Sequence, residues 1–261
     1  MTEAKIAQGL NWEAESLRLT AFFHPSAQVK PHGWWAALTG VDPENRNEKP
    51  SRGELSEWGN YLKGTLWLLV QPGRVDWFLL PVQPANPIAL DISQSSLGDF
   101  SPAVWSFVEL MAKWFPSTPP AIRLAFGGVL NRRVSGKTDG YKELSKFMNF
   151  VKVDETSSDF FYQINRPRTV NFGKDLLINR LSKWSVGAAQ LLRVSIPASP
   201  IVSGPAVVYT PADSVIFNCR LELDISTPGQ LQDEIDAHLL APILQGLVKL
   251  GEEISVRGDI P

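Results

Sequence analysis

The chain has 261 residues, of which 44% are hydrophobic and 20% are charged, and this composition excludes a disordered or fibrous protein. Its single cysteine, Cys219, excludes an intrachain disulfide and a cysteine-based zinc cluster. The net charge of -2 hides an asymmetry, because residues 121 to 193 hold 13 Lys+Arg and 6 Asp+Glu whereas the remainder holds 12 and 21. A basic middle between acidic flanks indicates a surface for an anionic partner.

The first residues, Met1 to Lys5, do not form a basic region followed by an apolar run, so we expect no secretory signal. The longest apolar stretches, near 66 to 70 and 77 to 82, are far shorter than the roughly 20 residues needed to cross a bilayer. We therefore expect a cytoplasmic protein, bacterial in general character, with no membrane partner.

The first strand is predicted at residues 17 to 23, and the polar segment from 41 to 53 is predicted to be a mobile loop. Two apolar runs follow, at 65 to 70 and 75 to 82. The Gln71-Pro72-Gly73-Arg74 sequence between them fits a type II turn and predicts a hairpin. Because both runs are apolar at nearly every position, we expect the hairpin to be covered on both faces.

A helix is predicted to begin with Ser101 as its N-cap and to end at Pro116, because apolar residues recur at helical spacing between them. This helix should pack on a sheet. The next predicted elements are a strand at 121 to 130, which ends at an Asn-Arg step, and a short amphipathic helix at 140 to 147.

The last third is expected to be rich in strands, at 150 to 153, 160 to 164, 184 to 196 and 215 to 225. The final one is the clearest, because apolar and polar residues alternate along it. Thr227-Pro228, with Gln230 three residues after the threonine, predicts a capping box that opens a C-terminal helix.

These elements predict an α+β protein in which helices pack on antiparallel sheet. Each half contains several strands followed by a helix, so two related β-rich lobes are expected, with candidate bounds 1 to 148 and 149 to 261. No low-complexity linker separates the halves, and we expect residues 1 to 261 to form a single compact unit.

Three Asn-Arg steps, each preceded by an aliphatic residue, end at Arg132, Arg166 and Arg180. In a structural interpretation, Asn tolerates left-handed backbone where strands end, and Arg lies over a sheet face. In a functional interpretation, the three steps converge on one face of the protein. There the guanidinium groups bind anions, and the aromatic rings stack on bases or cover the apolar surface of a partner. The predicted binding residues are Asn131, Arg132, Arg133, Tyr162, Arg166, Arg168, Arg180, Lys183 and Trp184. Pro167 lacks a backbone donor, so its segment should lie at an exposed edge or in a loop.

Asp76 lies on an apolar strand, and a buried carboxylate must be paired. Arg123, on the predicted strand 121 to 130, is the expected partner. We interpret the two as a structural ion pair in preference to a catalytic acid, which would need a raised pKa.

No catalytic or metal motif is complete. Gly136-Lys137-Thr138 resembles the end of a phosphate-binding loop, but residue 131 is not the required first glycine, so a turn before a helix is expected. The histidines, His24, His32 and His238, lack metal-ligand spacing. Cys219 should face the core. In His32-Gly33-Trp34-Trp35, the adjacent tryptophans of an extended chain would point to different sides. One of them could form a binding hot spot, or the segment could be a lid packed on the sheet edge. No cofactor is predicted.

Residues 122 to 133, which end in Val129-Leu130-Asn131-Arg132, resemble the hallmark strand of a sporadically distributed bacterial family of unknown function. In that family a strand led by Arg ends in Arg-Tyr-Ile-Asn-Arg. The chain length and the expected final helix after Leu223-Asp224 also fit the family. The resemblance implies no activity.

These features favour a non-enzymatic binding or scaffold protein that presents its basic Asn-Arg face to an anionic or protein partner. Another protein of a bacterial multi-protein system, such as phage defence, is the expected partner. The alternative is a nucleic-acid-binding module, which would lose affinity steeply with salt. An enzyme that uses Asp76 or the Gly136-Lys137-Thr138 turn is the third hypothesis.

Overall fold

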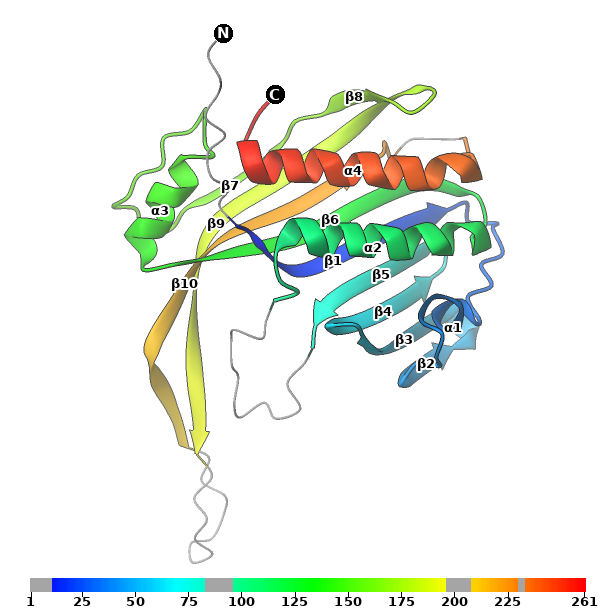
Figure 1. Cartoon of the computed structure of the whole chain (residues 1–261), viewed down its shortest axis with the longest axis horizontal. Coiled ribbons are helices and arrows are strands. Elements are labelled where there is room, and N and C mark those ends of the chain that lie inside the picture. The colour runs from blue at the N-terminus through cyan, green and yellow to red at the C-terminus, as the bar shows by residue number, and fades with distance from the viewer. Residues whose placement is uncertain (1–10, 83–95, 196–207, 230–232) are drawn as a thin grey trace, which may run out of the picture.

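The computed structural model describes residues 11–82, 96–195, 208–229 and 233–261. Their strands form one antiparallel sheet of ten strands, with the long helices α2 and α4 side by side on one face (Figure 1). The strands are β1 (Glu13–Phe23), β2 (Asn45–Lys49), β3 (Glu54–Tyr61), β4 (Gly64–Gln71), β5 (Arg74–Pro81), β6 (Ala121–Val134), β7 (Phe161–Asn165), β8 (Arg168–Asn171), β9 (Asp175–Ser195) and β10 (Val208–Ser226). The helices are α1 (Trp34–Thr39), α2 (Phe100–Trp114), α3 (Lys137–Ser145) and α4 (Ala237–Arg257). The predicted α+β class is confirmed.

The sheet is organised around the pairing of β1 with β6. Its strand order is β2-β3-β4-β5-β1-β6-β10-β9-β7, and β8 pairs with β9 beside β7. Each half starts with a central strand and ends with a long helix, from β1 to α2 and from β6 to α4. Because β6 pairs with β10, the strand pairing divides the chain after α2 and not at residue 148. The single compact unit and its two lobes stay predictions.

The core lies between the sheet and the two long helices. Leu17 and Leu19 of β1 and Phe126 of β6 are fully buried on this face. Gly251 of α4 lies against Phe126, and a Cβ there would stand 3.2 Å from that ring. Glycine at this position therefore lets α4 approach the sheet closely.

A cluster of tryptophans fills the other end of this core. Trp34 and Trp77 both contact Trp114 of α2, with ring centroids 5.3 and 5.9 Å away, and Trp35 stacks on Trp77. The expectation that adjacent tryptophans would point to different sides is wrong. Trp34 and Trp35 begin the short helix α1, in which successive side chains lie about 100° apart, so both enter the core.

The strands were predicted with mixed success. β1 and the β4–β5 hairpin are confirmed, and Gly73 in the turn has the expected positive φ of 69°. The hairpin, however, is covered on only one face, because burial alternates along β4. The loop expected at 41 to 53 contains β2, which is exposed at every residue and pairs with β3. Residues 150 to 153 form no strand.

Both long helices were predicted, with errors at their starts. The N-cap of α2 is Asp99 and not Ser101. The α4 helix begins at Ala237 and not after the expected capping box. The Thr227 hydroxyl instead accepts a hydrogen bond from the backbone N–H of Leu124, at 3.1 Å, and so ties the end of β10 to β6. Gln230 lies outside the described residues.

Candidate binding face

The face of the sheet turned away from α2 and α4 is called the open face here, and among the described residues no helix covers it (Figure 1). Strand register places side chains from distant parts of the chain in rows across it. The central row contains Trp58, Trp67, Phe78, Arg18, Gly127, Asp224 and Leu181. One end of this row, on β3, β4 and β5, is an aromatic region. The row continues into a charged region on β1, β6 and β10.

The aromatic region is centred on Trp67, which is 37% exposed. Its ring contacts Trp58 and Phe78, with centroids 5.7 and 6.5 Å away. The indole N–H of Trp67 donates to the Ser56 hydroxyl at 2.6 Å. The ring is thus held by neighbours on both sides while part of its surface remains accessible, an arrangement that suits a binding anchor.

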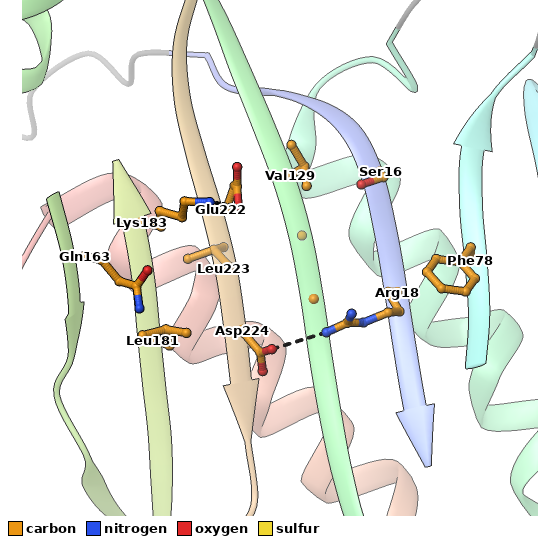
Figure 2. Close-up of a pocket in the computed structure, with 12 residues that line it drawn as sticks. Ser16, Arg18, Phe78, Val129, Gln163, Leu181, Lys183, Glu222, Leu223 and Asp224 are labelled. Atoms are coloured by element: carbon orange, nitrogen blue, oxygen red, sulfur yellow. Dashed lines mark hydrogen bonds and ion pairs between the residues drawn. The ribbon is translucent and has the colours of Figure 1, made fainter. Parts of the chain in front are cut away.

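A groove of 340 Å³ lies in the charged region, where side chains of β1, β6, β9 and β10 face one another (Figure 2). Gly127 forms part of its floor. A Cβ at Gly127 would stand 3.1 Å from Nε of Arg18. The missing side chain lets Arg18 of β1 cross over β6 and reach Asp224 of β10, with Nη2 3.2 Å from Oδ2.

Two more cations of the open face, Lys183 and Arg220, also lie against carboxylates. Lys183 Nζ is 3.0 Å from Glu222, and Arg220 contacts both Glu222 and Glu15, at 2.9 and 2.6 Å. Burial of Glu222 opposes ionisation, but hydrogen bonds from Arg220 and Lys183 hold the pKa of this carboxyl below its ordinary value. The groove therefore presents paired charges of both signs.

The first Asn-Arg step lies inside β6, whereas the sequence predicts it at the end of a strand. Asn131 faces the open side, where its amide donates to Glu15, and Arg133 is exposed two residues further on. Arg132 points to the opposite face and pairs with Glu143 of α3 at 3.1 Å. Alternation along the strand thus separates Arg132 from its two neighbours.

The second and third Asn-Arg steps meet across β7 and β9. The backbone N–H of Arg166 donates to the carbonyl of Arg180 at 3.3 Å, and the N–H of Arg180 donates to the Asn165 side chain at 2.8 Å. Pro167 interrupts the edge between β7 and β8, and the edge position expected for this segment is confirmed. These two steps lie at a different place from Asn131, which shares its row with Ser185 of β9.

Arg166 and Arg180 of these steps, together with Arg168, lie around the C-terminal end of α4. Arg166 binds both carboxylate oxygens of Asp259, and the Tyr162 hydroxyl donates to the same carboxylate at 2.7 Å. Arg168 donates to Glu253 at 2.5 Å. The hydrogen bonds from Arg166, opposed by burial, hold the pKa of Asp259 below its ordinary value.

Arg180 lies underneath this cluster and is only 2% exposed. Within the described residues its guanidinium makes no hydrogen bond, and its nearest carboxylate is Glu253, at 3.9 Å. Burial lowers the pKa of Arg180, and the nearby Arg168 adds to this effect. Trp184 is also buried, stacked on Phe147 with centroids 5.4 Å apart. The structure therefore does not place Arg180 and Trp184 on an exposed face.

The expected pair of Asp76 with Arg123 is not formed. Asp76 is 1% exposed and pairs with Arg74, two residues earlier on the same strand, with Nε 2.7 Å from Oδ2. The Thr20 hydroxyl also donates to Asp76, at 2.5 Å. Arg123 donates to the Ser226 hydroxyl at 3.1 Å and lies over Phe22.

The remaining motifs do not form a site. Gly136 is the N-cap of α3, and Lys137 and Thr138 lie in its first turn. Cys219 is buried, and burial raises the pKa of its thiol to about 12. Among the described residues no three or more His, Cys, Asp or Glu side chains are arranged to hold a metal ion.

Neither a scan against protein-family models nor a search of curated proteins finds a match to this chain. None of the described helices has the length and apolar character needed to span a bilayer.

The corrected pairing of Asp76 predicts different effects for two arginine substitutions. Arg74→Met should lower the free energy of unfolding by about 1–3 kcal/mol, because it leaves a buried carboxylate without its cation. Arg123→Met removes one hydrogen bond to a hydroxyl and should cost about 1 kcal/mol or less. Urea unfolding of both variants measures the difference. A larger loss in Arg123→Met would show that Asp76 depends on Arg123.

The low pKa of Asp259 predicts a contribution to stability that depends on pH. A carboxyl whose folded pKa is depressed stabilises the fold above its unfolded pKa, near 3.8, and loses this effect as pH falls through the folded value. Asp259→Asn should therefore be less stable than the unmodified chain at pH 7, and the gap should narrow at pH 3. Urea unfolding at both pH values provides the test. An equal gap at the two values would mean that Asp259 ionisation does not stabilise the fold.

Proposed function

We propose that the chain is a non-enzymatic binding or scaffold protein that docks another protein on its open face. The observation that carries this proposal is the central row of the sheet, where the held but accessible Trp67 lies beside a groove of paired charges. Asn131, Arg133 and Lys183 are the sequence-predicted binding residues that share this face. A cytoplasmic place in a bacterial multi-protein system, such as phage defence, is part of the same proposal.

The pairing of charges favours a protein over a nucleic acid as the partner. Nucleic-acid surfaces gain affinity from unpaired cations that replace the counterions of phosphates. Arg18, Lys183 and Arg220 each lie against a carboxylate, so phosphates would meet negative charge beside each of them. A protein surface of mixed charge, with an apolar patch for Trp67, fits this face better.

Arg166, Arg168 and Arg180 have a structural role in this proposal. The first two bind Asp259 and Glu253, and the third is buried. Their substitution should therefore lower stability before it affects the partner. This differs from the basic face expected from the sequence, in which the same arginines would contact the partner directly.

Substitution of Trp67 should weaken partner binding without unfolding the chain. We expect Trp67→Ala to lower affinity by roughly 30-fold or more, as for a central aromatic anchor worth about 2 kcal/mol. The measurement is capture from native lysate of the source cells at low and high salt, with and without nuclease, followed by titration of the captured protein. Val256→Ala is the matched control, because Val256 is 67% exposed and lies on α4, across the sheet from the open face.

The outcomes separate the hypotheses. A defined protein that survives nuclease, is retained by Val256→Ala and is lost by Trp67→Ala supports docking on the open face. Equal retention by both variants rules out Trp67 as the anchor. Capture of nucleic acid that is lost at high salt would instead establish the nucleic-acid-binding alternative.

A further inference from the structure

Strands β9 and β10 extend beyond every other strand of the sheet. The pairing of β10 with β6 ends at Phe217 and Val134, and the pairing of β7 with β9 ends at Phe161 and Ser185. The pairing of β9 with β10 continues to Ser195 and Val208. Residues 189–195 and 208–216 therefore form a two-stranded ribbon, which projects from the body of the sheet (Figure 1).

Hydrogen-bond directions identify the free edge of β9. The carbonyl of Arg180 accepts from Arg166 of β7, so the backbone groups of Arg180 point away from β10. The register between β9 and β10 is constant from Asn179 to Gln190, and the pairs beyond the shift, from Leu192 to Ser195, still set even-numbered residues of β9 opposite odd-numbered residues of β10. The directions of the backbone groups alternate along an antiparallel strand. Past Ser185, the backbone groups that point away from β10 therefore belong to Val186, Ala188, Gln190, Leu192 and Val194.

The two edges of the ribbon differ in their protection. On β10, the register shifts between Pro211 and Val215, and Pro211 stands opposite Leu192, where its nitrogen faces the outer edge. Proline and bulges are the devices by which edge strands avoid pairing with other chains. Residues 186–195 of β9 contain no proline and a single charged residue, Arg193. The β10 edge is therefore blocked, whereas the β9 edge past Ser185 is open in the sense that no described strand pairs with it.

We infer that the open β9 edge pairs in an antiparallel manner with the same edge of a second copy of this chain. An isolated two-stranded ribbon is only marginally stable in water, whereas two paired ribbons form a four-stranded sheet. Antiparallel pairing of one edge with itself satisfies twofold symmetry, because every contact is reciprocated. With a single charge on each edge, repulsion between the copies is small.

Proline scanning of the ribbon tests this inference in the full chain. The unmodified protein should sediment at twice its chain mass of 28.9 kDa, and Gln190→Pro should halve the observed mass, because it removes an outward N–H from β9. Tyr209→Pro is the matched control. Tyr209 stands opposite Val194, so its N–H faces the blocked β10 edge, and this variant should remain dimeric.

Amide exchange gives a second measurement that does not depend on a substitution. Exchange at Ala188 and Gln190 should slow as protein concentration rises, whereas the amide of Ala189, which faces β10, should be insensitive to concentration. Circular dichroism verifies that each proline variant is folded. Capture of the partner by Gln190→Pro should match that by the unmodified chain, which separates this inference from docking on the open face.

Several results would overturn the inference. A monomeric unmodified chain at its highest soluble concentration would do so, as would a dimeric Gln190→Pro. Dissociation of both proline variants would show that the ribbon matters without specific use of the β9 edge. Protection of Ala188 that appears only with a captured partner would assign the edge to a different protein.

Discussion

The pairing of β1 with β6 is the contact on which the rest of the structure depends. These strands join the two halves of the sheet, and every other strand attaches on one side or the other of this pair. Because α2 and α4 each follow the last strand of a half, both helices return over the same face of the sheet. The apolar positions of β1 and β6 meet these helices, and the alternate positions are left on the open face. One strand pair thus creates two faces with different chemistry.

Part of the charge asymmetry of the sequence is resolved by ion pairs between the basic middle and its acidic flanks. Arg166 and Arg168, from the basic middle, bind Asp259 and Glu253 from the acidic C-terminal flank, and Lys183 binds Glu222. An ion pair that is partly removed from water must satisfy its hydrogen bonds to be tolerated. Asp259 meets this requirement with donors from Arg166 and Tyr162. The fold therefore places some cations of the basic middle against carboxylates from distant acidic segments.

Local patterns in the sequence predicted the elements whose signals are local. The alternation of β10, the turn at Gly73 and the apolar spacing of α2 depend only on neighbouring residues. The sequence did not reveal β2, because an edge strand exposed at every residue carries no apolar alternation. It also missed the start of α4, because the Thr227 hydroxyl bonds to the backbone of β6, a contact between residues more than a hundred positions apart.

The candidate site shows the same boundary between local and distant information. Alternation along β10 predicts a solvent-facing side that includes Glu222 and Asp224. It does not identify which strands lie beside β10. For Asp76, Arg74 and Arg123 were both available. Arg74 is the partner because residues i and i+2 are neighbours on one face of the same strand, whereas β1 separates Arg123 on β6 from β5. Arg18 was missed because its role depends on Gly127, which lies more than a hundred residues away.

In the proposed docking, the paired charges of the open face determine what a partner gains there. A surface that approaches Arg18 must compete with Asp224, and one that approaches Lys183 must compete with Glu222. Attraction between net charges therefore contributes little, and the position of these pairs provides selectivity, because an unmatched charge would be desolvated without compensation. Affinity must then come mainly from apolar contact, and Trp67, held by Trp58 and Phe78, is placed to provide it. In the proposed docking, the aromatic region and the groove would thus have separate roles, with affinity in one and specificity in the other.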